Sequence, residues 1–507
     1  MKKEIIISVI LFFSTYLIIA QNRNEPFVWP ESSASIVFQD FIKAYNSKDE
    51  NEIEKFVLKH YSISKTEEIN EKVESWMDLV YRYGPVKPHS ISIHKEYDIE
   101  VWLECTVSKN WFAPEFILNE LTGKIRATGL LQGEQPNGVV NPSKNQNELL
   151  KITEQYLNQN SEAKLFQGVV LIQKNQQNIL NRAYGFSNEK LNINNSVNTR
   201  MRISSITKPI TVIACLQLVQ NGYLELDKPI SNYLPELPLR IANNISVRSL
   251  IMHTSGYELD GIQGFRDQLK KTKSMQEVYN LHLAYLPKWE KYKTFEPKGV
   301  YDYSNDSFDL LAIIIEKLTG MEFEDYLDKY IFDVAKMTST SFSNEDVAKP
   351  YRYDFKTGNL TDYTDYYPYS IGNTSGAGGL KSTVEDLSKL FNTLYFSEKL
   401  LDLPQKNLMF SMLLQSYSAA NPDVGPTPLR NHETTFNKTP RVKNGRSMGF
   451  SISYDTNLSY GHNGTSIGNS AELRYFPHSG YLMIVLCNNR SGAQNFFRFF
   501  NNHLPKH

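Results

Sequence analysis

The chain has few cysteines and no excess of either charge, and both features exclude classes of protein. Three cysteines occur among 507 residues, Cys105, Cys215 and Cys487, and each lies in an apolar stretch. They predict buried free thiols rather than a disulfide framework, and no Cys/His spacing predicts a metal site. The formal net charge of -1 gives no support to a nucleic-acid partner, which usually needs a basic excess.

The N-terminus combines a basic start with an apolar run. Lys2 and Lys3 precede 16 mainly apolar residues from Ile5 to Ala20. The run is long for the core of a signal peptide and short for a membrane-spanning helix. We expect a signal peptide over residues 1–20 and export to the periplasm or the medium. An uncleaved N-terminal anchor is the alternative, because Ile18 fits poorly where cleavage sites have a small residue. Contact with a membrane is expected only through this segment.

A chain of this length rarely forms a single core, and its patterns change along the sequence. Residues 25–132 begin with helical periodicity and continue with alternating strands, which predicts a small α+β domain. This order of elements resembles the NTF2-like fold. Residues 133–146 are rich in Asn, Gln, Gly and Pro and predict a linker. Residues 147–507 have strand patterns near both ends and helices between, which predicts an α+β domain with one antiparallel sheet flanked by helices.

A serine three residues before a lysine is a candidate nucleophile with its base, but the spacing S-x-x-K occurs several times in the chain. Three copies lie in polar stretches, where an exposed surface is the simpler interpretation: Ser62/Lys65, Ser161/Lys164 and Ser187/Lys190. Another copy, Ser205/Lys208, precedes the apolar run "ITVIACLQLV", which predicts a buried helix.

Pro209 follows this lysine and locates the start of the helix. Proline is tolerated only in the first turn, so the helix begins near Ser204 or Ser205. Ser205 then lies where unpaired backbone N–H groups favour negative charge, with Lys208 on the same face. A desolvated lysine there could serve as a general base.

With Ser205 and Lys208 in this setting, the sequence resembles the serine hydrolases of the penicillin-binding and β-lactamase superfamily. The branch is that of class C β-lactamases, D-Ala-D-Ala carboxypeptidases and related esterases. Its motifs are S-x-x-K, then Y-x-N, then K-T-G or H-x-G. "YSN" at Tyr303 and Asn305 precedes a helix, with Asp306 expected as its cap, whereas "YLN" at Tyr156 comes too early in the chain. The resemblance implies that Tyr303 relays a proton and that Asn305 holds the lysine and a substrate carbonyl.

The third motif has competing matches. A literal K-T-G, Lys356–Gly358, lies in a polar stretch typical of a hairpin tip, and "KNG" at Lys443 and "HSG" at His478 also occur. The family places the motif on an edge strand near the C-terminus, so we choose His462, Asn463 and Gly464. By resemblance, Gly464 lets a substrate lie against the strand. The backbone N–H groups of Ser205 and Thr465 are expected to form an oxyanion hole.

The resemblance also implies a β-lactamase/transpeptidase-like fold with an all-helical lobe, and no cofactor or metal. His253 in "MHTSG" is interpreted as structural, and Gly378 and Gly379 as turn residues. Ser204 stands where relatives often have glycine, and His462 stands in place of lysine. Because histidine is mostly neutral at pH 7, it anchors a carboxylate weakly. This favours peptidase or esterase activity over an efficient β-lactamase, and no motif provides a dedicated deacylating glutamate.

The expected function is therefore an exported serine hydrolase that forms an acyl-enzyme on the carbonyl of a peptide, an ester or a β-lactam. One alternative is a penicillin-binding or sensor protein with negligible turnover. Another is a degenerate scaffold without a reactive serine, which the full set of three motifs disfavours. The motifs fit all three substrate classes and give no signal for an oligomeric state.

Overall fold

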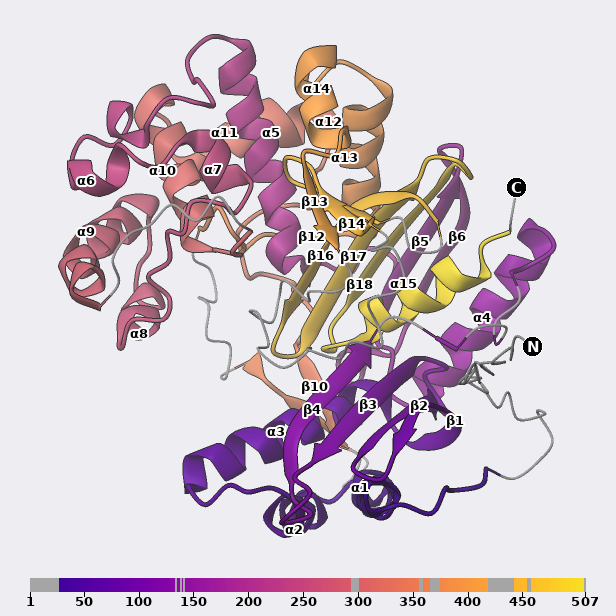
Figure 1. The fold of residues 1–507 in the computed structure, drawn as a ribbon. Helices are drawn as coiled ribbons and strands as arrows, with labels where there is room; N and C mark the ends of the chain where they lie inside the picture. The colour runs from indigo at the N-terminus through magenta and orange to yellow at the C-terminus, as the bar shows by residue number, and fades with distance from the viewer. Residues whose placement is uncertain are drawn as a thin grey trace, which may run out of the picture. The chain divides into compact units, whose positions relative to one another are not determined.

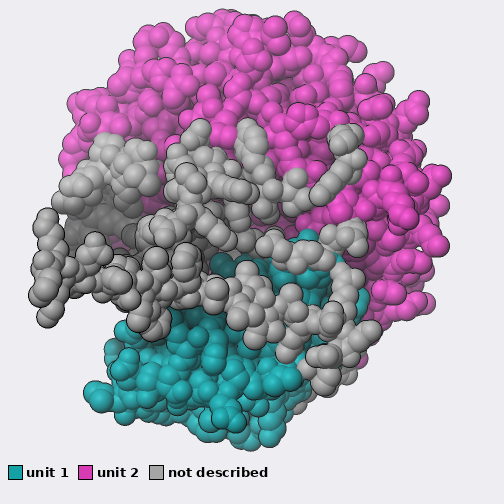
Figure 2. Space-filling model, turned by 45° about the vertical axis from the view of Figure 1, so that its right-hand side comes forward, with its two compact units in different colours: residues 1–80, 85–139 teal, residues 81–84, 140–507 magenta. Residues whose placement is uncertain are grey.

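The structure, a computed structural model, describes most of the chain. The described residues are 27–132, 135–136, 139, 142–292, 301–354, 359–364, 374–417, 442–453 and 457–505. The predicted signal peptide (1–20) and the literal K-T-G (356–358) lie outside them. The chain divides into two compact units, Met1–Val80 with Pro85–Val139 and Tyr81–Gly84 with Val140–His507 (Figure 2). The boundaries expected from the sequence, 25–132, 133–146 and 147–507, stay a prediction.

The first unit has helices followed by an antiparallel sheet of four strands in the order β1-β2-β3-β4. Its elements are α1 (Ser33–Ser47), α2 (Glu50–His60), α3 (Thr66–Tyr83), β1 (Val86–Lys95), β2 (Asp98–Cys105), β3 (Trp111–Leu118) and β4 (Ile125–Gln132). Aromatic side chains form its core: the Phe41 ring lies 4.6 Å from that of Trp76 and 5.2 Å from that of Phe116, between centroids. The predicted order of helices and strands is confirmed, and the NTF2-like fold stays a prediction.

The second unit contains an antiparallel sheet of eight strands in the order β13-β14-β15-β16-β17-β18-β5-β6. Its strands are β13 (Leu414–Tyr417), β14 (Val442–Arg446), β15 (Ser451–Ser453), β16 (Ser459–Ser466), β17 (Asn469–Phe476), β18 (Tyr481–Cys487), β5 (Gly168–Lys174) and β6 (Gln177–Tyr184). The two ends of the unit's sequence meet where β18 pairs with β5, with Ile484 opposite Leu171. This confirms the prediction of one sheet built from both ends.

Successive residues of the central strands face opposite sides of this sheet, because side chains alternate along a strand. Val170 and Ile172 pack with α4 (Gln146–Glu162) and α15 (Gly492–His503), which lies across the strands in Figure 1. Val169 and Leu171 belong to the larger cluster, which includes α5 (Thr207–Gln220), α10 (Asp306–Thr319) and α13 (Val384–Phe396).

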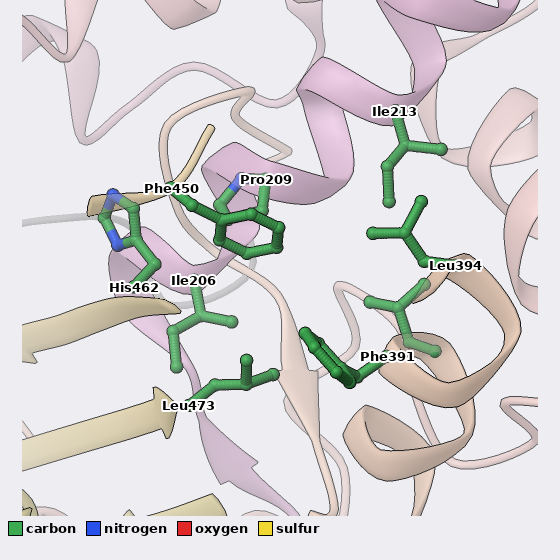
Figure 3. Close-up of a pocket in the computed structure, with 9 residues that line it drawn as sticks. Ile206, Pro209, Ile213, Phe391, Leu394, Phe450, His462 and Leu473 are labelled. Carbon is green, nitrogen blue, oxygen red and sulfur yellow. The ribbon is translucent and has the colours of Figure 1, made fainter. Parts of the chain in front are cut away.

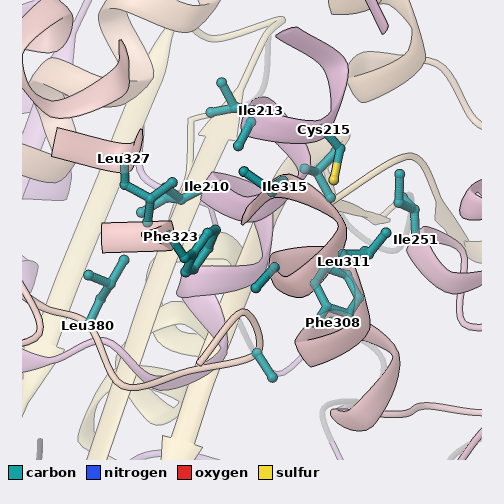
Figure 4. Close-up of a cluster of buried hydrophobic side chains, with 14 of the residues drawn as sticks. Ile210, Ile213, Cys215, Ile251, Phe308, Leu311, Ile315, Phe323, Leu327 and Leu380 are labelled. Carbon is teal, nitrogen blue, oxygen red and sulfur yellow. The ribbon is translucent and has the colours of Figure 1, made fainter. Parts of the chain in front are cut away.

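Helix α5 is the centre of the larger cluster. Every residue from Thr207 to Leu218 is buried, which is typical of a helix enclosed on all sides. Figure 4 shows Ile210, Ile213 and Cys215 of this helix beside Phe308 and Leu311 of α10. The predicted buried helix is therefore confirmed, and the three cysteines are free and buried, as expected.

The remaining elements of the second unit connect these layers. They are β7 (Phe186–Asn188), β8 (Ile193–Asn194), β9 (Met201–Arg202), η1 (Ser204–Ile206), η2 (Ile230–Asn232), α6 (Leu239–Ala242), α7 (Val247–Ile251), α8 (Phe265–Leu269), α9 (Met275–Tyr292), α11 (Phe323–Leu327), η3 (Asp328–Phe332), α12 (Asp333–Ala335), β10 (Tyr351–Asp354), β11 (Asn359–Asp362), β12 (Lys381–Ser382) and α14 (Leu403–Phe410). Over the part of the chain that the structure describes, no helix is long and apolar enough to cross a membrane.

Candidate functional site

The predicted nucleophile lies on a tight turn that leads into α5. Ser205 belongs to the short helix η1, and α5 follows with Pro209 as its third residue, as the sequence predicts. Ser204 has a positive φ of 48°, a conformation that costs little only for glycine. The Ser204 Oγ accepts a hydrogen bond of 3.0 Å from Nδ2 of Asn469 on β17. This bond stabilises the turn at Ser204.

Four predicted site residues meet at one point. The Nζ of Lys208 donates to Oγ of Ser205 at 3.1 Å and to Oδ1 of Asn305 at 2.8 Å. The hydroxyl of Tyr303 lies 2.8 Å from Ser205 Oγ on another side. Ser205 is half-buried and Tyr303 is 36% exposed, whereas Lys208 is only 1% exposed. The site is therefore open at the serine and closed around the lysine.

The hydrogen-bond partners of Lys208 determine which way the remaining position on its Nζ atom points. Besides Asn305 Oδ1, the carbonyl oxygen of Ala377 accepts from Nζ at 2.9 Å. Both are carbonyl oxygens, which can only accept. Two N–H bonds of the amine are thus committed, and the remaining tetrahedral position points at the Ser205 hydroxyl. That position holds a hydrogen in the ammonium form and a lone pair in the free amine.

The expected cap of α10 is wrong in detail. Asp306 is the first residue of the helix, and the N-cap is Asn305, which makes no side-chain capping bond. The amide of Asn305 is instead engaged by Lys208. The carboxyl group of Asp306 accepts hydrogen bonds through Oδ2 from the backbone N–H groups of Leu259 at 2.5 Å and Asp260 at 3.0 Å. It therefore stabilises a neighbouring loop rather than its own helix end.

Strand β16 places His462, Gly464 and Thr465 beside the serine turn. A Cβ at Gly464 would overlap the carbonyl oxygen of Ile203 and lie 3.1 Å from the Ser205 nitrogen. The expectation that Gly464 lets a substrate lie against the strand stays a prediction. The glycine makes room for the protein's own turn. Gly464 and Ser205 backbones are therefore neighbours, and Thr465, the next residue, is exposed.

The expected edge position of this motif needs correction as well. β16 lies inside the sheet, since β13, β14 and β15 continue beyond it. However, β15 is short and pairs with β16 only over Ser459–Gly461. Among the described strands, none pairs with the outer edge from His462 to Ser466, so the sheet is locally open beside the site.

His462 is neutral at physiological pH, in agreement with the prediction. Burial and the nearby charge of Lys208 lower the pKa of His462 to about 3. Its Nδ1 lies 2.6 Å from the carbonyl oxygen of Asn463, which assigns the ring hydrogen to Nδ1. His462 ends an apolar pocket that extends to Phe391 and Leu394 of α13 (Figure 3). The residue is thus a neutral polar group at an apolar wall.

His253 contacts one of the predicted catalytic residues. It has a positive φ of 56°, and its Nδ1 accepts the backbone N–H of Ser304 at 3.1 Å. Its ring stacks on the Tyr303 ring, with centroids 4.5 Å apart. Burial and the charges of Lys208 and Arg446 hold the pKa of His253 well below its usual value. A structural role for His253 therefore means that its neutral ring supports the ring of Tyr303. Gly379, with φ of 94°, is a turn residue, as expected.

Sequence reasoning missed several groups around the site. Ala377 acts through its backbone carbonyl, and Asn469 acts from a distant strand, so neither has a recognisable motif. Arg446 of β14 lines a second pocket together with Lys208, His253 and His462. Its guanidinium lies 4.6 Å from the Tyr301 ring centroid. In the sequence, the only feature that could have indicated a role for Arg446 is that a basic residue precedes the C-terminal motif.

One buried cluster has the residue types of a metal site. Potential ligand atoms of His282, Asp306 and Asp309 all lie within 4.8 Å of one another. Some of these potential ligand atoms already form hydrogen bonds within the protein. Asp306 accepts two backbone N–H groups, Asp309 accepts from Ser375 and Gly376, and His282 Nδ1 bonds the Tyr257 hydroxyl. We assign these groups to the hydrogen-bond network beneath α10 and assign no metal to them.

Comparison with known proteins agrees with this geometry. At 27% identity, 271 residues resemble a putative penicillin-binding protein, PbpX, of Bacillus subtilis (53% of this chain, 64% of the relative). At 28% identity, 236 residues resemble teichoic acid D-alanine hydrolase of Staphylococcus aureus (46% of this chain, 55% of the relative). The chain thus spans less than two thirds of the length of either relative.

Solved structures show the same fold. A penicillin-binding protein from Bacillus halodurans matches with a TM-score of 0.53 at 22% identity, over 69% of this chain and 98% of that protein. D-amino acid amidase from Ochrobactrum anthropi SV3 matches with a TM-score of 0.54 at 20% identity, over 70% of this chain and 97% of that protein. The sequence profile described as "Beta-lactamase" matches residues 154–499, which is more than half of the chain. The chain belongs to the Beta-lactamase family.

Proposed function

We propose that this protein is an exported serine hydrolase that works through an acyl-enzyme. The observation that supports it best is the convergence of Ser205, Lys208, Tyr303 and Asn305 within hydrogen-bond distance. Two proton-transfer groups flank one partly exposed hydroxyl, which is the arrangement that nucleophilic catalysis by serine requires. Export rests on the N-terminal apolar run.

The reaction follows from the positions of these groups. Ser205 Oγ attacks the substrate carbonyl while its proton passes to the free amine of Lys208, with Tyr303 as a relay to the leaving group. Backbone N–H groups of Ser205 and Thr465 bind the oxyanion. The C–O or C–N bond to the leaving group then breaks, and the leaving group departs with the proton. Water attacks the acyl-serine and releases the acid.

The substrate class is a peptide, ester or β-lactam carbonyl, and the neutral His462 favours the first two. A histidine of pKa about 3 supplies no positive charge for a substrate carboxylate, so the charge available there is that of Arg446, which lines the same pocket. The names of two similar proteins, a D-alanine hydrolase and a D-amino acid amidase, point in the same direction. We therefore place D-amino acid esters and amides first among the substrates.

The test compares the wild type with Ser205→Ala on a panel of short-chain nitrophenyl esters, D-amino acid amides and a fluorescent penicillin. We expect turnover of at least one ester or amide and a loss of about 1,000-fold or more in the variant. Ser204→Gly is the matched control, because it changes the adjacent serine without strain at a positive φ. No adduct, no turnover and no difference between wild type and Ser205→Ala would contradict the proposal.

The alternative function is a sensor or penicillin-binding protein that is acylated but turns over negligibly. It is favoured by the absence of a dedicated deacylating glutamate among the motifs. Intact-mass measurements over several hours, after a single addition of penicillin or ester, distinguish the two. An adduct that disappears supports the hydrolase, and an adduct that persists at full occupancy supports the sensor.

A further inference from the structure

Lys208 has no acidic side chain in direct contact, although it is almost completely buried. Its Nζ has three acceptors, Ser205 Oγ, Asn305 Oδ1 and the Ala377 carbonyl, and all three are neutral. In the described part of the chain, no ion pair includes this lysine. A buried ammonium without a compensating negative charge is costly, so some nearby group must compensate when Lys208 is protonated.

Asp309 is connected to this amine through one short segment. The carboxylate is 3% exposed, and its Oδ1 accepts from the Ser375 hydroxyl at 2.6 Å and from the Gly376 N–H at 3.1 Å. The next residue is Ala377, whose carbonyl accepts from Lys208 Nζ. The Ala377 N–H itself donates to the Ser375 hydroxyl at 3.1 Å. The carboxylate thus holds the turn that orients the lysine.

We propose that Asp309 is the counter-charge and positioning residue of Lys208, and that its negative charge stabilises the ammonium form of Lys208 relative to the free amine. This inference rests on the proposed function, in which Lys208 accepts the Ser205 proton. Asp309 lies one turn into α10, outside the three motifs that identify the family. Its effect travels by two routes, the electric field and the Ser375–Ala377 segment.

The neighbouring titratable groups leave Asp309 as the negative charge of this cluster at neutral pH. Burial raises the pKa of Asp306, on the same helix, to about 8, so Asp306 is mostly protonated. Burial lowers the pKa of His282, on α9, to about 3 and raises that of the Tyr257 phenol, so both are neutral. Asp260, which faces Asp306, is paired with Arg266.

Asp309 itself titrates close to the physiological range. Burial raises its pKa to about 6, while the Ser375 hydrogen bond and the charge of Lys208 act in the opposite direction. Above that pH the carboxylate favours the ammonium form of Lys208. Removal of the negative charge favours the free amine, whose lone pair points at the Ser205 hydroxyl. The acid limb of the pH–rate profile should therefore move to lower pH when the Asp309 charge is removed.

The experiment measures kcat/KM for nitrophenyl ester hydrolysis from pH 4.5 to 9 in the full chain. Asp309→Asn keeps an acceptor oxygen and removes the charge, and we expect the acid limb to move down by about one pH unit. Asp306→Asn is the matched control, because Asp306 is an aspartate of similar burial on the same helix turn, is bonded to another loop, and is mostly uncharged at neutral pH. This control should lower the rate, if at all, without moving the limb.

The outcomes separate this inference from the proposed function. The inference is overturned if the wild type is active and Asp309→Asn only lowers the maximum of the pH–rate profile, with the acid limb at the same pH. Asp309 would then have a structural role only. A wild type with no Ser205-dependent turnover would overturn the proposed function instead. If Asp309→Asn does not fold, the ¹⁵N signal of Lys208 Nζ in the wild type, assigned with Lys208→Arg, replaces it. An inflection near pH 6 supports the coupling, and its absence contradicts it.

Discussion

The hydroxyl oxygen of Tyr303 lies 2.8 Å from Oγ of Ser205, although the two residues are 98 positions apart in the sequence. The Tyr303 ring is in turn stacked on His253 and lies 4.8 Å from Lys208 Nζ, measured to its centroid. The tyrosine is therefore held by its ring and free to act through its hydroxyl.

Tyr303→Phe removes that hydroxyl and keeps the ring. We expect kcat/KM for ester hydrolysis to fall about 100-fold to 10,000-fold, the usual range for loss of a proton-transfer group. The thermal midpoint should change little, because the stacking on His253 is retained. Steady-state kinetics and thermal denaturation measure both. Tyr233→Phe deletes a hydroxyl that accepts the Glu225 N–H in another loop, and it should leave the rate unchanged. A Tyr303→Phe rate within threefold of wild type would exclude the relay.

Gly464→Ala places a methyl group against the carbonyl of Ile203 in the serine turn. Because the obstacle is backbone, the turn or the strand must move, at a cost of about 1–3 kcal/mol in the free energy of unfolding. The Ser205 nitrogen should move too, so the acylation rate should fall at least about tenfold. Gly261→Ala is the control, since nothing lies within 4 Å of its added Cβ. Denaturant unfolding and the rate of penicillin labelling test this, and equal labelling rates would contradict the assigned geometry.

The left-handed conformation of Ser204 predicts different outcomes for two substitutions. Ser204→Gly removes strain of about 1 kcal/mol and also a hydrogen bond to Asn469 of about the same value, so stability should be nearly unchanged. Ser204→Val puts a β-branched side chain at a positive φ, and we expect it to destabilise the fold by more than 1 kcal/mol. Equal unfolding midpoints for the two variants would argue against this backbone conformation.

Asp306 predicts a pH dependence of stability. Its folded pKa of about 8 lies above its unfolded value near 3.8, so the folded state binds the proton more tightly. The contribution of Asp306 to stability is complete below the unfolded pKa and is lost as the pH rises through 8. Asp306→Asn cannot ionise, so the stability of the variant relative to wild type should rise by about 1 kcal/mol per pH unit between pH 5 and 8. Urea denaturation at several pH values measures this difference, which a pH-independent gap would contradict.

Much of the fold and several site residues were predictable from local patterns. Pro209 and the apolar run behind it located the start of α5, because proline is restricted to the first turn. The strand patterns near both ends of the second unit indicated a shared sheet, which the pairing of β18 with β5 confirms. The spacing of Ser205 and Lys208 and the motif at Tyr303 and Asn305 identified four residues that the structure brings together.

The sequence by itself determined the helix start, the order of the motifs and the neutral character expected of His462. Only the tertiary structure decided that Asp306 stabilises a loop, that Gly464 faces the serine turn, and that the Ala377 carbonyl binds Lys208. The physical reason is that capping and periodicity act over a few residues, whereas these contacts join distant segments. A backbone carbonyl also has the same chemistry at every position, so the sequence cannot mark the one that binds Lys208.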